Sequence, residues 1–283
     1  MSETSTIGVD PAFVGIDTSF TAFLVWRVEK LVLVQVSPEH FGQFYEGDSY
    51  VVFVASEPAK SVDPTSKPYK VYGGRIEQHI HFWLGKTTST DEAAVAAYKS
   101  VELDSFLGGT PVQHREVQER ESTRFRGYFK KGIRYLIGGI ASGLNHVAKT
   151  SEPKLYKVKG KRSPTVTQMP AIDWKYFNSN DVFILDTNDG VIFIWIGMAA
   201  NPMEKLQATK VAQELKVENK AKALVFVEEG EELDLPEAEK ILLEAYLDLH
   251  ASEGVKGNLN DSDEVDEHNH YSHITLYQCS DED

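Results

Sequence analysis

The fold of this chain is decided by residues 112–143, where four short motifs follow one another closely. They read Val112-Gln-His-Arg-Glu-Val-Gln118, Glu121-Ser122, Gly127-Tyr-Phe-Lys-Lys-Gly132 and Gly138-Gly-Ile-Ala-Ser-Gly143. Further motifs precede them: Gly47-Asp48-Ser49-Tyr50, His81-Phe-Trp-Leu-Gly85, Asp91-Glu92, Leu103-Asp104 and Leu107-Gly108. Each motif alone is weak evidence, but the ordered set is specific enough to indicate one fold.

The chain also repeats part of its own sequence. Asp48-Ser-Tyr-Val-Val-Phe53 resembles Asp181-Val-Phe-Ile-Leu-Asp186, and Ile80-His-Phe-Trp-Leu-Gly85 resembles Ile192-Phe-Ile-Trp-Ile-Gly197. In both copies a glutamate follows the tryptophan at the same spacing, as Glu92 and Glu204. Self-similarity of this kind indicates two copies of one structural unit.

The repeat predicts an α/β protein with two domains. Short apolar runs rich in Val, Ile, Phe and Trp predict buried strands, and a helix should follow each tryptophan strand, over residues 91–107 and 202–217. We expect a first domain at residues 12–148 and a second at residues 149–250. Residues 251–283 are acidic and poor in apolar side chains, which predicts a linker. Within them, residues 274–279 resemble the first strand of the repeat and could begin a third copy.

Together these motifs resemble the gelsolin, villin, severin and fragmin family over residues 13–277. The resemblance implies the first two gelsolin-like domains, from a fragment or a short family member, each with a mixed sheet of about five or six strands between one long and one short helix. It implies calcium-regulated actin binding, with filament severing and barbed-end capping. The alternatives are a capper or monomer sequestrant that does not sever, and a phosphoinositide-binding adaptor.

Composition narrows the function classes further. The formal net charge is −14, which argues against nucleic-acid binding. The N-terminus lacks the basic and apolar regions of a signal peptide, and no apolar run approaches the roughly 20 residues of a transmembrane helix. The single cysteine, Cys279, cannot form an intrachain disulfide. We therefore expect a cytoplasmic protein that does not span a membrane, and the resemblance implies that it belongs to the cytoskeleton.

An enzymatic function is not expected. The sequence holds no Gly-rich phosphate loop, Walker lysine, G-x-S-x-G elbow or H-E-x-x-H helix. His79 and His81 alternate on a predicted strand, and without a third ligand in view the pair is interpreted as structural.

A helix over residues 91–107 would carry two apolar stripes. One would pack on the domain's own sheet and holds Ala93, Ala96, Ala97, Ser100, Leu103 and Leu107. The other, about 140° away, holds Ala94, Tyr98 and Val101. Only one stripe is needed to hold the helix in its domain, so the second predicts a partner surface, and the resemblance implies that this partner is actin. The alternative is an ordinary exposed surface, because single exposed apolar residues are common.

A calcium site would have to form from separated oxygen atoms, because no EF-hand loop is present. The resemblance implies three such sites. The first would use Gly47, Asp48, Glu92 and Ile140. The second would use Asn180, Asp181, Glu204 and Asp266. The third, shared with actin, would use Asp104, Gly109 and Pro111. Taken alone, these carboxylates fit helix starts and strand edges without a metal; their recurrence in both repeats, with the resemblance, favours calcium (Ca²⁺).

Two basic clusters stand out in this acidic chain. One follows the first domain's short motifs, and the other opens the second domain. Such clusters favour acidic partners, and the resemblance implies polyphosphoinositides and the sides of actin filaments. The candidate residues are Lys130, Lys131, Arg134, Lys157, Lys159, Lys161 and Arg162. A solvated surface without a partner is the alternative.

Overall fold

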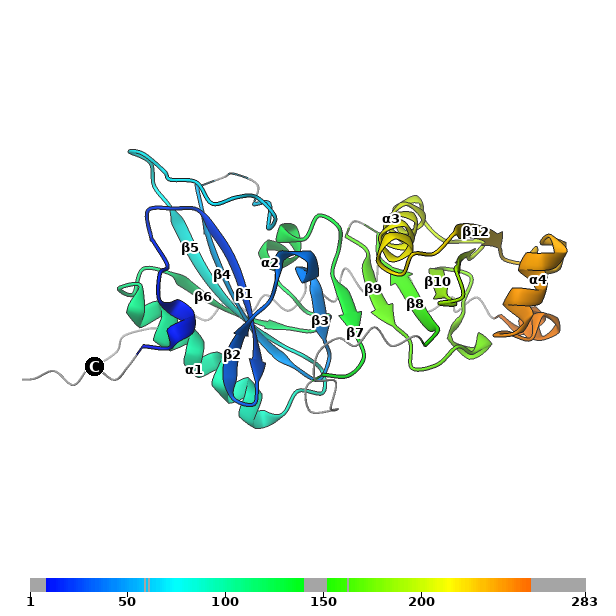
Figure 1. The fold of residues 1–283 in the computed structure, drawn as a ribbon, viewed down its shortest axis with the longest axis horizontal. Helices are drawn as coiled ribbons and strands as arrows, with labels where there is room; N and C mark the ends of the chain where they lie inside the picture. The colour runs from blue at the N-terminus through cyan, green and yellow to red at the C-terminus, as the bar shows by residue number, and fades with distance from the viewer. Residues whose placement is uncertain (1–8, 59, 61, 140–151, 162, 256–283) are drawn as a thin grey trace, which may run out of the picture. The chain divides into compact units, whose positions relative to one another are not determined.

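The computed structural model describes residues 9–58, 60, 62–139, 152–161 and 163–255. The chain divides into two compact units, Met1–Thr150 and Ser151–Asp283, here called the first and second domains. Figure 1 shows the elements of each domain. Short helical turns lie at Pro11–Phe13, Pro38–His40, Trp174–Tyr176, Glu232–Asp234 and Leu249–Gly254.

The first domain is built on a mixed five-stranded sheet. In spatial order its strands are β2 (Val32–Gln35), β1 (Ala22–Glu29), β4 (Ser49–Ser56), β5 (Glu77–Leu84) and β6 (Val112–Val117). Only the β5–β6 pair in this sheet is parallel. A parallel pair needs a crossover connection, and the long helix α1 (Thr90–Phe106) supplies it. A separate parallel pair joins β3 (Gln43–Tyr45) to β7 (Arg134–Leu136).

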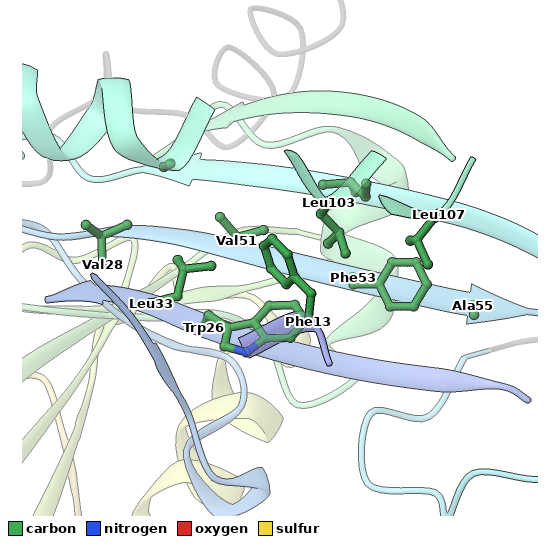
Figure 2. Packing of buried hydrophobic residues seen from close by; sticks show 11 residues of the cluster. Phe13, Trp26, Val28, Leu33, Val51, Phe53, Ala55, Leu103 and Leu107 are labelled. Carbon is green, nitrogen blue, oxygen red and sulfur yellow. The ribbon is translucent and has the colours of Figure 1, made fainter. Parts of the chain in front are cut away.

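Alternate residues of β4 supply the two faces of this sheet, as strand geometry requires. One apolar core takes Val51, Phe53 and Ala55, and the other takes Tyr50, Val52 and Val54. The first core also holds Leu103 of α1 and is drawn in Figure 2. The second core holds Phe125 of the short helix α2 (Thr123–Tyr128). The long and the short helix therefore cover opposite faces of the sheet.

The second domain repeats this plan. Its strands lie in the order β12 (Ala223–Glu228), β11 (Val191–Ile196), β10 (Val182–Asp186), β8 (Lys154–Lys159) and β9 (Thr165–Gln168). Only β11 and β12 are parallel among them, and α3 (Pro202–Glu218) connects the two. Phe183 and Leu185 of β10 lie in one core with Leu243 of the short helix α4 (Glu237–Glu244). The other face of β10 is left for α3, which packs on this sheet.

Capping side chains fix where the two long helices begin. Ser89 caps α1 by accepting a hydrogen bond from the Glu92 N–H at 3.2 Å. At α3, Asn201 and Glu204 form a capping box, with Pro202 in the first turn. Both glutamates therefore occupy the first turn of a long helix, at the end of the sheet where the preceding strand stops.

The tryptophan of each repeat donates a hydrogen bond to a buried glutamate. The Trp83 indole N–H reaches Glu121 Oε1 at 3.0 Å, and the Trp195 indole N–H reaches Glu232 Oε1 at 2.7 Å. Burial raises the pKa of Glu121 above its usual range. These paired contacts satisfy buried polar groups in each core.

Candidate metal and partner-binding sites

One face of α1 is exposed and apolar. Ala94, Tyr98 and Val101 point away from the sheet, with 61% of Tyr98 and 53% of Val101 exposed to solvent. These three residues are called the α1 stripe below. Ala96 and Leu103, on the opposite face, are fully buried. The helix thus holds its place through one face and leaves the α1 stripe available to a partner.

Local ion pairs order the side chain next to the α1 stripe. Lys99 Nζ lies 2.8 Å from Asp10 Oδ2 and 2.7 Å from Glu102 Oε2. The same ammonium lies 5.7 Å from the centroid of the Tyr98 ring. A cation at this distance interacts favourably with an aromatic ring, so Lys99 contacts the Tyr98 ring as well as two carboxylates.

Asp48 stands just before β4 and is completely buried. The turn at Gly138 and Gly139 packs directly against it: the Gly47 N–H donates to the Gly138 carbonyl at 2.8 Å. A Cβ atom on Gly139 would lie only 2.5 Å from Asp48 Oδ1, and the residue has φ +151°. Only glycine fits there, so the backbone of this turn can lie directly against the Asp48 carboxylate.

Two hydroxyl groups link Glu92 to the start of β4, next to Asp48. The hydroxyls of Ser49 and Thr88 lie 2.8 Å apart, and the Thr88 hydroxyl donates to Glu92 Oε2 at 3.4 Å. Ser49 directly follows Asp48, so this path links the two predicted calcium carboxylates of the first domain. Both carboxylates are buried, and a buried pair of negative charges needs a cation or polar partners nearby.

Asp104 lies in the last turn of α1, beside the loop that carries Gly109 and Pro111. The Gly109 N–H donates to the Asp104 carbonyl at 2.9 Å, and Gln113 Nε2 donates to Asp104 Oδ2 at 3.0 Å. Oδ1 of Asp104 is buried and accepts no hydrogen bond from the described parts of the chain. Asp104 is one helical turn beyond Val101 and therefore adjoins the α1 stripe.

The second domain places Asp181 and Glu204 in the equivalent positions. Asp181 is 1% exposed and Glu204 is fully buried. Asp181 Oδ2 accepts a hydrogen bond from Asn178 Nδ2 at 2.8 Å and lies 2.7 Å from Lys157 Nζ. Oδ1 of Asp181 is buried and accepts no hydrogen bond within the described residues. Asn180 is half-buried next to this carboxylate.

The basic candidates differ in how they are presented. Lys130, Lys131 and Lys161 are exposed, and Lys159 is half-buried. Arg134 is buried, with only 7% of the residue exposed, so it is less available to a headgroup than the sequence suggested. Three predicted site residues, Ile140, Arg162 and Asp266, lie outside the described residues, as do residues 274–279.

Sequence reasoning missed a histidine cluster at the β5–β6 pair. His81 faces His114 across this pair, and their ring centroids are 4.4 Å apart in a stacked arrangement. His81 Nδ1 lies 2.8 Å from Glu116 Oε1, and one ligand atom each of His81, His114 and Glu116 lies within 4.8 Å of the others. The nitrogen lone pairs of an imidazole lie in its ring plane, so these nearly parallel rings hold their lone pairs in separate planes that do not converge on one ion. The cluster therefore suits a hydrogen-bond network better than a shared metal ion. His79 extends the network, with Nδ1 at 3.0 Å from His114 Nε2.

This network predicts acid sensitivity of the first domain. Burial, followed by the nearby Arg124 charge, lowers the pKa of His79 from its usual 6.5 to about 4; burial also lowers the pKa values of His81 and His114. The unfolded chain then binds protons that the folded chain refuses, so stability falls as pH drops from about 6.5 towards 4. Thermal unfolding between pH 7.5 and 4.5 should show this loss, and His79→Gln should make it shallower. An equally steep loss in that variant would contradict the assignment.

No helix within the described residues is long and apolar enough to span a membrane.

Known proteins are similar to this chain in sequence. The gelsolin repeat family matches residues 30–126 and 165–235. Gelsolin of Gallus gallus is 41% identical over 212 residues, covering 74% of this chain and 25% of that protein. Advillin of Mus musculus is 38% identical over 261 residues, covering 91% of this chain and 29% of that protein. The actin depolymerising venom protein gelsolin 1 of Platymeris rhadamanthus is 35% identical over 282 residues, covering 98% of this chain and 70% of that protein.

These matches agree with the architecture above. Two α/β domains, each with a mixed sheet between a long and a short helix, define a protein built from gelsolin repeats. The chain belongs to the gelsolin family. It spans between a quarter and three tenths of the length of chicken gelsolin and mouse advillin.

Proposed function

We propose that this chain is a non-enzymatic actin-binding protein of the cytoplasm and cytoskeleton, and that its first domain binds one actin subunit through the α1 stripe. The observation that carries this proposal is the exposed, apolar second face of α1 in a chain built from gelsolin repeats. A relative matched over nearly the whole chain is an actin depolymerising venom protein. Aromatic side chains with a polar tip are common anchors in interfaces, and Tyr98 is such a residue.

Calcium fits the carboxylates of both domains. Asp104 and Asp181 each keep a buried oxygen that accepts no hydrogen bond from the described chain, and Gly139 brings the backbone against Asp48. Hard divalent calcium prefers such carboxylate and carbonyl oxygens. We propose that Asp48 and Glu92 hold one ion with the backbone of Gly47 and Ile140. Asp181 and Glu204 would hold a second ion, with Asn180 and Asp266.

A third ion would be held jointly with the partner. Asp104, Gly109 and Pro111 lie at the C-terminal end of α1, next to the α1 stripe. An actin subunit on that stripe would bring its own surface close to Asp104. Calcium, when bound, supplies the positive charge that lets carboxylates of two proteins approach each other. An ion that binds best to the assembled complex strengthens the complex by linkage.

Severing is proposed as the outcome of both domains acting on one filament. The second domain would bind the filament side, for which Lys159 and Lys161 are the basic candidates. The first domain would then insert the α1 stripe into a subunit and compete with the neighbouring subunit for the same cleft. The energy for breaking the filament would come from binding, without hydrolysis.

Single-filament fluorescence microscopy tests this step. With calcium present, immobilised filaments should fragment within the observation time, and the new barbed ends should stop elongating. If filaments remain whole but stop growing, the chain caps filaments without severing them. If filaments only shorten, in proportion to the added protein, the chain sequesters actin monomers.

Phosphoinositides are proposed as a second acidic partner. Lys130 and Lys131 are neighbouring, exposed lysines in the turn between α2 and β7, and adjacent surface lysines attract anionic headgroups. Vesicles with phosphatidylinositol bisphosphate should sediment the wild-type chain in the absence of actin. A variant with both lysines changed to glutamine should sediment less, and equal sedimentation of the two would contradict this site.

A further inference from the structure

We propose that Lys157 is a built-in counter-ion of the second-domain calcium position, which it occupies when calcium is absent and whose calcium affinity it lowers. The proposal rests on the calcium binding proposed above. Lys157 would regulate one site only, so the two domains would respond to different calcium concentrations.

Lys157 lies beside the predicted calcium carboxylate of the second domain. It lies on β8, next to β10, and its ammonium is 2.7 Å from Oδ2 of Asp181. The Asp181 side chain is 1% exposed and that of Lys157 is 19% exposed. An ion pair that is largely removed from water is screened far less than a surface pair. The negative charge of this ligand is therefore already compensated by the chain itself.

Lys157 and a calcium ion would compete for the Asp181 carboxylate. Calcium binds carboxylate oxygens at about 2.3–2.6 Å, so an ion on Asp181 would lie within a few ångströms of the Lys157 ammonium. Two positive charges so close together repel each other strongly in a buried setting. Calcium can bind there only if the ammonium moves away. The ion then loses affinity by the free energy of the ion pair that it displaces.

Glu204 is also held by the chain. Its Oε1 accepts a hydrogen bond from the Gly160 N–H at 2.8 Å, and its Oε2 accepts one from the Asn201 N–H at 3.1 Å. Both candidate carboxylates of the second domain therefore have internal partners. The buried Oδ1 of Asp181, which accepts no hydrogen bond from the described residues, shows where an ion would still gain a ligand.

The first domain offers an internal comparison. Arg27 occupies the equivalent position on the first strand of its repeat. Its guanidinium lies 2.6 Å from Glu29 Oε1 and 3.5 Å from Asp48 Oδ2. The Arg27 guanidinium pairs more closely with Glu29 than with Asp48, and it stays farther from its calcium candidate than Lys157 does from Asp181. The first-domain position should thus bind calcium more readily than the second.

Calorimetric calcium titration of the full chain tests this proposal. The parent carries Asp48→Asn, Glu92→Gln and Asp104→Asn, so that only the second-domain position remains. Adding Lys157→Gln should tighten calcium binding at least about tenfold. The matched control is Lys222→Gln, an exposed lysine at the opposite end of the same sheet, and it should leave the affinity unchanged. Adding Asp181→Asn to the parent should abolish the heat of calcium binding.

The outcomes separate this proposal from the function on which it rests. Equal affinity in the parent and the Lys157→Gln variant would overturn the counter-ion role while leaving the calcium site in place. Absence of binding in both would instead refute the second-domain calcium site, and the counter-ion role with it. A calcium-free measurement gives a second readout: Lys157→Gln should speed hydrogen exchange in β10, and Asp181→Asn should add no further increase. Unchanged exchange in Lys157→Gln would also count against the proposal.

Discussion

Tyr98→Asp should weaken binding to monomeric actin by at least about 30-fold, because buried aromatic anchors commonly contribute about 2 kcal/mol or more to an interface. The substitution places a charge in the middle of the α1 stripe, where complex formation would remove it from water without a cationic partner. Tyr98 is 61% exposed in the free chain, so the folded domain should tolerate the change. Fluorescence titration of labelled monomeric actin measures the effect.

Tyr72→Asp is the matched control for this variant. Tyr72 belongs to the same domain, is 84% exposed and lies in the segment between β4 and β5, outside α1. It carries the same chemical change outside the α1 stripe and should leave actin affinity within about twofold of wild type. If Tyr98→Asp and Tyr72→Asp bind equally well, the α1 stripe is not the binding surface.

Asp48→Asn combined with Glu92→Gln should reduce the calcium bound by the free chain by one ion. The two amides keep the shape of the carboxylates but remove both negative charges from the proposed site, and neutral amides alone hold calcium poorly. Isothermal titration calorimetry without actin gives the stoichiometry directly. The rise in melting temperature that calcium causes should shrink in the same variant, because ligand binding to the folded state stabilises it.

Glu39→Gln combined with Asp63→Asn is the control for charge alone. Both carboxylates are in the first domain, and each accepts a hydrogen bond from a neighbouring loop residue. This pair should leave the calcium stoichiometry unchanged. An unchanged stoichiometry in the Asp48→Asn, Glu92→Gln variant as well would show that these residues do not hold an ion.

The strands and long helices could be predicted because their signals are local. The periodicity of residues 91–107 predicted α1, and the helix start at Pro202 predicted α3. The predicted ends of both helices agree with the observed ends to within one residue. The family and the two-faced α/β fold followed from motifs whose order and spacing are visible in the chain. The repeat in the sequence also predicted that Asp48 and Glu92 occupy positions equivalent to those of Asp181 and Glu204.

Contacts that depend on strand register could not be predicted. A run of valine, isoleucine and phenylalanine does not say which residue of the neighbouring strand lies opposite. His114 and Glu116 meet His81 only because β5 and β6 pair in parallel with one particular register. The ion pair of Lys157 with Asp181 arises in the same way from the pairing of β8 with β10.

The sequence alone did not show which basic side chains are buried or paired within their own domain. Lys157 and Arg134 counted as members of basic clusters, and both were predicted to meet acidic partners. In the folded chain Arg134 is buried, and Lys157 is paired with an aspartate of its own domain. A basic residue on a strand can point into the interior of its own domain, whereas Lys130 and Lys131 lie exposed to solvent in a turn.

The most direct test of the central claim is a structure of the chain bound to monomeric actin in calcium. The account predicts that α1 lies against actin with the Tyr98 ring buried in the interface and that Asp104 ligates an ion together with an actin carboxylate. A complex in which the α1 stripe faces solvent would contradict it.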